Sequence, residues 1–274
     1  MLTHTVFLEF RQMLQNAGPR NSSRCRISRL GAHRRRLRAL GATLLSLGLW
    51  AAAPQASAQC GPDITLAEAQ WRMVAISCDP GGSNNTVGDV LGPSLGIVNY
   101  NTTWVAWRRV YNSPATCAVP SGPADCYQKL TVNDTLAAGD ALWVYSTVEI
   151  SLQYSTVANS TSGPSFTFPS PVGDNRFFMF GNPYEATVDY ADLTFEGAFL
   201  GFIPLSLTTQ AAANFGVINE PVFYWNGVNT YFTRNLGNPP PAATFTPKEA
   251  AWIEMEAGSG LFAGFTIRVP DPSP

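Results

Sequence analysis

The sequence predicts an all-β protein made of two tandem small β-sandwich or barrel-like modules, with at most short helices. Three observations lead to this fold class. Val, Thr, Tyr, Phe and Trp are frequent, and 23 Gly and 21 Pro separate short apolar runs. Long helical periodicity is missing, and only 13% of the residues are charged. Finally, a set of landmarks occurs twice in the same order, which indicates two copies of one structural unit.

Each copy is predicted to contain the same succession of elements. An aromatic strand ends at an Asp-Pro or Asn-Pro turn, and a short helix with an acidic first turn follows. A Trp-containing strand, a Tyr-containing strand and a further strand complete the copy. In the first copy these are 71–77, a helix opened by a Thr86–Asp89 capping box, 103–110, 127–131 and 141–150. In the second they are 176–180, a helix near Asp189 and Asp192, 221–225, 230–233 and 250–257, then a last strand at 261–269.

Two further details complete this prediction. The run of three alanines at 211–213 predicts a helix within 207–218. Alignment of the two copies by their shared residues matches Trp107 with Trp225 and Trp143 with Trp252.

Residues 1–58 are predicted to be a signal peptide with an N-terminal extension. A basic stretch at 34–38, an apolar stretch at 39–53 and small residues at 56–58 are typical of a secretory leader. The apolar stretch is too short for a good permanent membrane span. We therefore expect export to the periplasm, the cell surface or the medium, by the Sec or the twin-arginine route. A misassigned start codon and a long basic leader are alternative explanations of the extension. The expected parts after the leader are 59–154, the first module; 155–175, a linker; 176–270, the second module; and 271–274, a tail.

Removal of the leader makes the chain strongly acidic. Nine of the 17 Lys and Arg and one of the 19 Asp and Glu precede residue 59, which leaves 8 basic and 18 acidic residues and a net charge of −10. This balance argues against nucleic acid or an anionic membrane as a partner. Both histidines, His4 and His33, lie in the leader. The exported chain therefore lacks the residue needed for Ser-His-Asp or Cys-His catalysis and for His-ligated zinc.

Four cysteines follow the leader: Cys60, Cys78, Cys117 and Cys126. An even number in an exported chain predicts disulfides, and four cysteines allow three pairings. Cys117–Cys126 is the most local pair, and Cys60–Cys78 would then join the mature N-terminus to the first strand. Zinc is the alternative, but no Cys-x-x-Cys pair is present.

The best candidate for a ligand-binding surface lies on the last strand of each copy. Strand alternation puts Trp143 and Tyr145 on one face, and Trp252, Glu254 and Glu256 on the equivalent face. Tryptophan beside carboxylates suits binding of a sugar ring. The alternative is that the repeated tryptophans are core residues.

Other candidates have simpler explanations. Aspartates near turns suggest a calcium site as an alternative to turn capping, but no complete Asp-x-Asp-x-Asp-Gly loop occurs. Gly92-Pro-Ser94-Leu-Gly96 fits a nucleophile elbow without a histidine to activate Ser94. Residues 258–263 fit the loose dinucleotide pattern, but they join two predicted strands and are interpreted as a hairpin turn. The acids Glu254 and Glu256, like Asp189 and Asp192, lie too close in sequence to flank a glycosidic bond.

The whole pattern resembles a repeat of uncharacterised secreted or surface proteins of bacteria. In that repeat, a Trp-initiated strand ends in a Pro turn, and a Leu-x-Pro-Gly turn leads into a Gly-aromatic-Trp-Val strand. Here Asn182-Pro183 matches the second copy's turn, and Leu136 and Gly139 keep part of the later turn. Lys248 stands in the place of the turn glycine in the second copy. The resemblance implies no particular activity.

These observations predict an exported, non-catalytic structural, adhesive or binding protein of the bacterial cell exterior. The alternatives are a carbohydrate-binding module and a glycoside hydrolase-like enzyme whose carboxylates come from distant strands. The expected partner is a polysaccharide or another surface protein. No cofactor is expected, apart from the calcium alternative.

Overall fold

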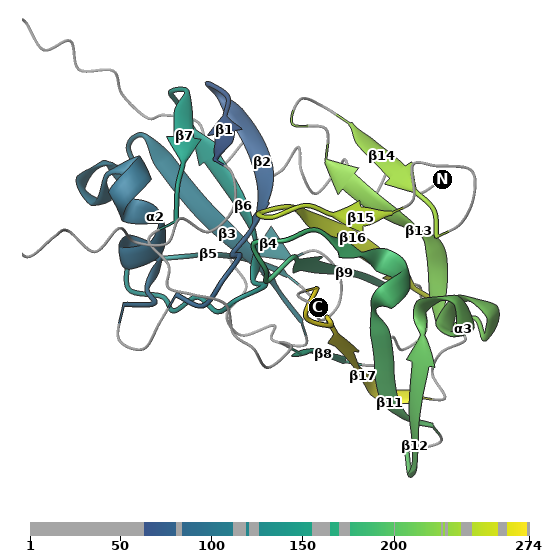
Figure 1. Ribbon diagram of the computed structural model, residues 1–274. Helices are drawn as coiled ribbons and strands as arrows, with labels where there is room; N and C mark the ends of the chain where they lie inside the picture. Colours follow the sequence, from purple (N-terminus) through teal and green to yellow (C-terminus); the bar gives the residue numbers. More distant parts are fainter. Residues whose placement is uncertain are drawn as a thin grey trace, which may run out of the picture. The chain divides into compact units, whose positions relative to one another are not determined.

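The protein is described by a computed structural model that covers residues 63–80, 84–111, 119–120, 126–154, 165–169, 176–199, 201–225, 227, 230–236, 243–256 and 262–272. Contacts divide the chain into Met1–Ala56 and Ser57–Pro274, and every described residue belongs to the second unit. The predicted leader therefore lies outside the described residues, as do Cys60 and Cys117. In the described part, antiparallel sheets dominate and the helices are short (Figure 1). The all-β class is confirmed.

The first sheet contains strands from residues 70–146. Its strand order is β2-β6-β3-β5-β4, and every neighbouring pair is antiparallel. The strands are β2 (Gln70–Ala75), β3 (Trp104–Val110), β4 (Val119–Pro120), β5 (Cys126–Lys129) and β6 (Ala141–Ser146).

The second sheet contains strands from residues 176–255. Its order is β14-β13-β16-β9, again antiparallel throughout. The strands are β9 (Arg176–Gly181), β13 (Ile218–Trp225), β14 (Tyr231–Arg234) and β16 (Ala250–Met255).

A third sheet, with order β12-β11-β17-β8, packs on the second. It consists of β8 (Ser165–Pro169), β11 (Thr194–Phe199), β12 (Ile203–Thr208) and β17 (Phe262–Arg268). Of these, β17 was predicted and the others were not. Strand β8 lies inside the stretch 155–175 that the sequence predicts as a linker. Two small ladders pair β1 (Ile64–Leu66) with β7 (Ile150–Leu152), and β10 (Val188–Asp189) with β15 (Thr244–Phe245).

Helix α2 begins at the capping signal found in the sequence. In α2 (Val87–Leu95) the hydroxyl of Thr86 accepts from the Asp89 N–H at 3.1 Å, and the Asp89 carboxylate accepts from the Thr86 N–H at 3.2 Å. This confirms the predicted capping box. Helix α3 (Thr209–Asn214) lies within the range predicted from its alanines. The remaining helical segments are short 3₁₀ turns, η1 (Ile97–Asn99) and η3 (Tyr190–Asp192).

The first and second sheets have equivalent strand orders. Strand β2 corresponds to β9, β6 to β16, β3 to β13 and β5 to β14. Register gives the equivalent residues: Trp143 pairs with Met73 and Trp107, and Trp252 pairs with Met179 and Phe223. Trp143 and Trp252 therefore occupy equivalent positions in the two sheets, as the sequence similarity of the two copies predicts. Separate tandem modules are not confirmed, because Ser57–Pro274 forms one compact unit.

The register corrects one of the matched landmarks. Arg109 lies opposite Tyr127, as Trp225 lies opposite Tyr231. Counted from the central tryptophans, Trp107 is thus equivalent to Phe223, and Arg109 is equivalent to Trp225. The alignment of the two copies by sequence similarity therefore placed these strands two residues out of register. A shift of two keeps the alternation of side chains, so the pattern alone could not reveal it.

The first and second sheets are each covered on both faces. One face of the first sheet packs on α2, β1 and β7, and one face of the second packs on the third sheet. The other two faces meet at what we call the seam. There the rings of Trp143 and Trp225 lie 5.6 Å apart at 77°, and the Arg109 guanidinium lies 5.2 Å from the centre of the Trp252 ring. Trp225 Nε1 also donates to the Trp71 carbonyl at 2.9 Å.

The strands β2 and β9 cross-connect the two sheets at the seam. The Ala75 N–H donates to the carbonyl of Lys248 at 2.9 Å, and the Gly181 N–H donates to the carbonyl of Gly139 at 3.1 Å. These two bonds are equivalent, since Ala75 matches Gly181 and Gly139 matches Lys248 in register. Residues 139 and 248 also share a left-handed backbone, with φ of 84° and 64°.

Candidate functional site

The predicted ligand-binding face lies mainly in the interior. Trp143, Trp252 and Glu254 are 0%, 3% and 3% exposed, because this side of each sheet faces the seam. Tyr145 and Glu256 are half-buried. The prediction that these residues share a face fits the strand alternation, but the tryptophan rings are covered by the opposite sheet. Stacking on a sugar needs an open ring face, so Trp143 and Trp252 cannot provide it in this fold.

The two described cysteines, Cys78 and Cys126, are buried and disulfide-bonded. Their predicted partners, Cys60 and Cys117, lie outside the described residues, so the pairing stays a prediction.

The aspartates near turns have capping roles. Asp140 accepts from the Ala137 N–H at 2.9 Å, and Asp189 accepts from the Ala191 N–H at 3.0 Å. Asp134 caps Thr131 in the same way. Within the described ranges, no three His, Cys, Asp or Glu side chains gather closely enough to hold a metal ion.

Ser94, in the match to a nucleophile elbow, has a structural role. Its hydroxyl donates to the Gln153 carbonyl at 2.6 Å and accepts from the Gln153 N–H at 2.9 Å. It thereby ties α2 to the end of β7. Residues 258–260 of the dinucleotide-like match lie outside the described residues.

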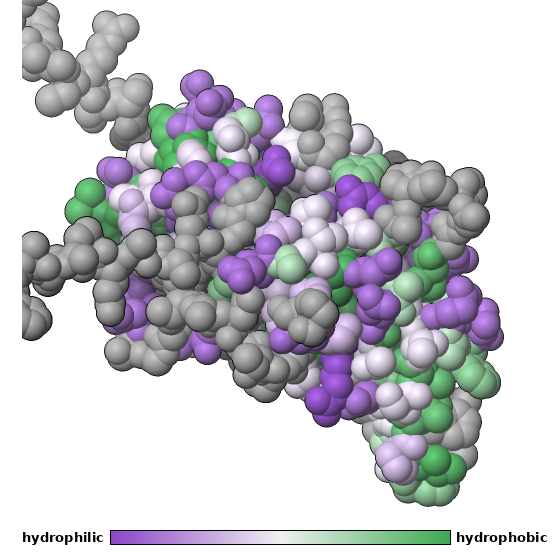
Figure 2. All heavy atoms as spheres, in the orientation of Figure 1, coloured by the Kyte–Doolittle hydropathy of each residue, from purple (hydrophilic) through white to green (hydrophobic). Residues whose placement is uncertain are grey.

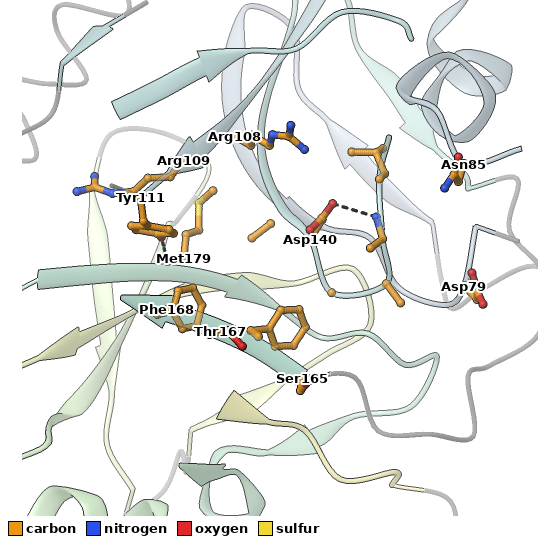
Figure 3. Close-up of a pocket in the computed structure, with 16 residues that line it drawn as sticks. Asp79, Asn85, Arg108, Arg109, Tyr111, Asp140, Ser165, Thr167, Phe168 and Met179 are labelled. Atoms are coloured by element: carbon orange, nitrogen blue, oxygen red, sulfur yellow. Dashed lines mark hydrogen bonds between the residues drawn. The ribbon is translucent and has the colours of Figure 1, made fainter. Parts of the chain in front are cut away.

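A cleft of about 720 Å³ opens at one end of the seam. We call it the seam cleft (Figure 3). Its walls come from four parts of the chain: Arg108 to Tyr111 at the end of β3, the turn 136–141, residues 165–168 of β8, and Met179 of β9. Asp79 and Asn85 lie at one end of it (Figure 3). The first sheet thus supplies the polar wall, and β8 supplies an aromatic wall.

The polar wall carries opposite charges. Arg108 makes two long hydrogen bonds, from Nε to Gln128 Oε1 at 3.3 Å and from Nη1 to the Thr135 carbonyl at 3.4 Å. Burial raises the pKa of Asp140, and the Ala137 N–H and the positive charge of Arg108 oppose that rise. The cleft can therefore donate and accept hydrogen bonds from adjacent positions.

Arg109 has a different task from its neighbour. Its guanidinium lies over three rings, at 5.8 Å from Tyr111, 5.5 Å from Tyr127 and 5.2 Å from Trp252. Cation–π contacts of this kind fix the side chain between the two sheets. Both arginines line the cleft, and Arg109 is also held in the seam by these ring contacts.

Sequence reasoning missed this cleft. Its walls come from segments up to about 100 residues apart, and no local pattern relates Arg108 to Phe166. The available signal was indirect, namely that the two copies differ at the turn where Gly139 matches Lys248.

A second surface feature is the β11–β12 hairpin, whose tip is apolar (Figure 2). Phe202 and Ile203 are 73% and 42% exposed there. Among the described helices, none has the length and hydropathy needed to span a membrane.

Comparison of the chain with protein-family models, with curated proteins and with solved structures found no match in any of the three. The resemblance to a bacterial surface repeat therefore stays a prediction, and the functional argument rests on the geometry of the seam cleft.

Proposed function

We propose that this chain is an exported, non-catalytic binding protein with a structural or adhesive role at the bacterial cell exterior, and that it binds its ligand in the seam cleft. The observation that supports this most is the composition of the cleft. An open concave site joins a half-buried Arg108 and Asp140 to the aromatic side chains Tyr111 and Phe166. Few convergent polar groups on an apolar wall are typical of ligand sites.

Export is supported by the sequence of the leader and by the acidic balance of the remaining chain. A non-catalytic role is supported by the positions of the nucleophiles and acids. No histidine follows residue 33, and the hydroxyl of Ser94 is engaged with Gln153. Asp140 makes the same turn-capping bond as its equivalent in the second sheet, Glu249, which accepts from the Thr246 N–H at 2.9 Å. A turn role explains both acids.

A carbohydrate is the second candidate ligand. It is favoured by aromatic rings that lie in the same cleft as Arg108, Asn85 and Asp140, since sugars present both apolar ring faces and hydroxyl groups. The hydrolase alternative is supported only by the presence of two acids, Asp79 and Asp140, in the cleft. If the binding role is correct, the chain should hydrolyse no polysaccharide, whereas hydrolysis that Asp140→Asn abolishes would favour the enzyme.

The test is to fill the cleft without disturbing the fold. Ala137 is exposed and lines the cleft, so Ala137→Trp should block it. Thr246 is the equivalent exposed turn residue of the second sheet, away from the cleft, and Thr246→Trp is the matched control. Binding should be measured on the same arrays of polysaccharides and peptides for all three proteins. Loss of binding in Ala137→Trp alone is expected. The proposal is overturned if Ala137→Trp weakens the binding of no polysaccharide and no peptide.

A further inference from the structure

One wall of the seam cleft is the free edge of a β-sheet. Among the described strands, β8 is the outermost of the third sheet and has β17 as its one partner. Its residues 165–168 all line the cleft, and Figure 3 shows Ser165, Thr167 and Phe168 along one side. In an antiparallel pair, alternate residues of an edge strand direct their N–H and C=O groups away from the partner. Among the described residues, no backbone hydrogen bond outside the strand ladders involves β8.

This edge contains a proline only at its last residue, Pro169, and residues 165–168 are unprotected. Proteins usually protect an open edge with a charged residue or a proline, because an unprotected edge pairs with foreign strands. The other edges of the three large sheets carry such residues: Arg72 in β2, Pro120 in β4, Arg176 in β9, Pro204 in β12 and Arg234 in β14. In β8 the four residues before Pro169 have neither a charge nor a proline. Such an edge is suited to pairing, and its position in a concave cleft limits which strands can reach it.

The opposite wall can hold the backbone and side chains of an added strand. In the described structure, Arg108 Nη2 and Asp140 Oδ1 make no hydrogen bond, so one offers a donor and the other an acceptor. Between the two walls lie the rings of Tyr111 and Phe166. Four edge residues span about 13 Å at the usual rise of a strand, enough to pair with a short extended segment.

We propose that the seam cleft binds an extended polypeptide segment of a partner protein, which adds to the third sheet as a strand beside β8. The bound segment is uncharged where it pairs with β8, since neither residues 165–168 nor the adjacent rings offer a countercharge. A polypeptide fits better than an oligosaccharide because only another backbone repeats donors and acceptors at the spacing of a strand edge. This inference rests on the proposed function, because it assigns a ligand class to the same cleft.

The experiment selects peptides on the full chain from a displayed library of random heptapeptides. The selected peptide is then made in two N-methylated forms, each methylated on one alternate set of its amides. One set faces β8 and the other faces away. Methylation of the set that faces β8 removes two or more backbone hydrogen bonds and should weaken binding roughly tenfold or more. Methylation of the other set is the matched control and should change affinity much less.

Variants of the protein test the location. Thr167 is exposed on β8, and its hydroxyl lies 3.1 Å from that of Thr266 on β17. Thr167→Lys places a charge in the cleft and should weaken the selected peptide at least tenfold, whereas Thr266→Lys lies outside the cleft and should not. Binding should also slow hydrogen exchange of alternate amides within 165–168.

Each outcome decides the inference. Loss of affinity in one N-methylated form, together with loss in Thr167→Lys, supports strand addition. Equal affinity of both N-methylated forms, no effect of Thr167→Lys, or no selected peptide overturns it. Binding of a polysaccharide that Ala137→Trp abolishes would leave the proposed function intact while it refutes the peptide. Absence of any cleft-dependent binding refutes both.

Discussion

The close contact between β2 and β9 predicts that one added methyl group destabilises the protein strongly, and that removal of the opposing methyl group restores its stability. Gly181 in β9 lies so close to β2 that a Cβ atom placed on it would be 2.1 Å from the Cβ of Ala75 and 2.9 Å from its Cα. Real Cβ atoms do not approach so closely, and one of these two contacts is with backbone. Gly181→Ala therefore forces the two strands apart.

The magnitude follows from what must move. Overpacking by one methyl group in a filled interior costs about 1–3 kcal/mol. The upper end applies here, because separation of the strands also lengthens the two cross-sheet bonds of Ala75 and Gly181. We expect Gly181→Ala to lower the free energy of unfolding by about 2–3 kcal/mol. Ala75→Gly alone should cost about 0.5–1 kcal/mol, as glycine does in a strand.

The decisive protein is the double variant Ala75→Gly/Gly181→Ala, which moves the single methyl group from one strand to the other. Its stability should return to within about 1 kcal/mol of the wild type, so the two substitutions are strongly non-additive. Urea unfolding followed by tryptophan fluorescence measures all four proteins. Additive effects, or a neutral Gly181→Ala, would show that β2 and β9 do not meet at this position.

Three further predictions concern single sites. Lys248 is 1% exposed with Nζ 3.9 Å from Asp63 Oδ1, and burial lowers its pKa from 10.5. Between the lowered pKa and 10.5, the unfolded chain therefore binds more protons than the folded chain, and stability rises with pH. The free energy of unfolding of the wild type, measured in urea, should increase relative to that of Lys248→Met across this pH range. A difference between the two proteins that does not depend on pH would contradict this. Thr86→Ala should cost about 1 kcal/mol in thermal unfolding by removing the cap of α2. Asp89→Ala should cost a similar amount because its carboxylate accepts from both the N–H and the hydroxyl of Thr86, and no change in either variant refutes the capping role. Phe195 is 1% exposed, so Phe195→Ala should lower the free energy of unfolding by about 3–5 kcal/mol. Phe202→Ala at the exposed hairpin tip should change it by no more than about 0.5 kcal/mol, and equal losses in the two variants would mean that the tip is packed.

Local signals predicted the local structure well. The capping box at Thr86, the helix within 207–218 and most strands of the first two sheets agree with the structure. These features depend on residues within a few positions of one another, so the sequence contains the information directly. The third sheet was largely missed, although β11 and β12 lie on either side of Gly201, which has a turn conformation with φ of 80°. Residues 194–208 lie inside the predicted second copy, between its helix and its Trp-containing strand, where the first copy has no strand to match them.

Long-range burial was the harder problem. Alternation shows that Trp143 and Tyr145 share a face, but it cannot say whether that face meets solvent or another sheet. In a sheet buried on both sides, a polar residue does not identify the face that meets solvent. Glu254 illustrates the difficulty, since a carboxylate in a strand suggests solvent and yet is 3% exposed beside Trp252. For this reason the predicted ligand-binding face includes Trp143, Trp252 and Glu254, which the structure buries in the seam.

The difference between the two sheets explains why a cleft forms where it does. Gly139 and Lys248 hold equivalent places with the same left-handed backbone. A Cβ atom at Gly139 would lie 2.0 Å from Cζ of Phe166, so only glycine allows β8 to pack against this turn. At the other turn Lys248 fills the equivalent space itself, and its Nζ lies 5.1 Å from the centre of the Tyr154 ring. The glycine therefore admits the free edge of β8 to one end of the seam, and the lysine closes the other. The replacement of the turn glycine by lysine is thus the difference that separates the proposed binding site from a packed interface.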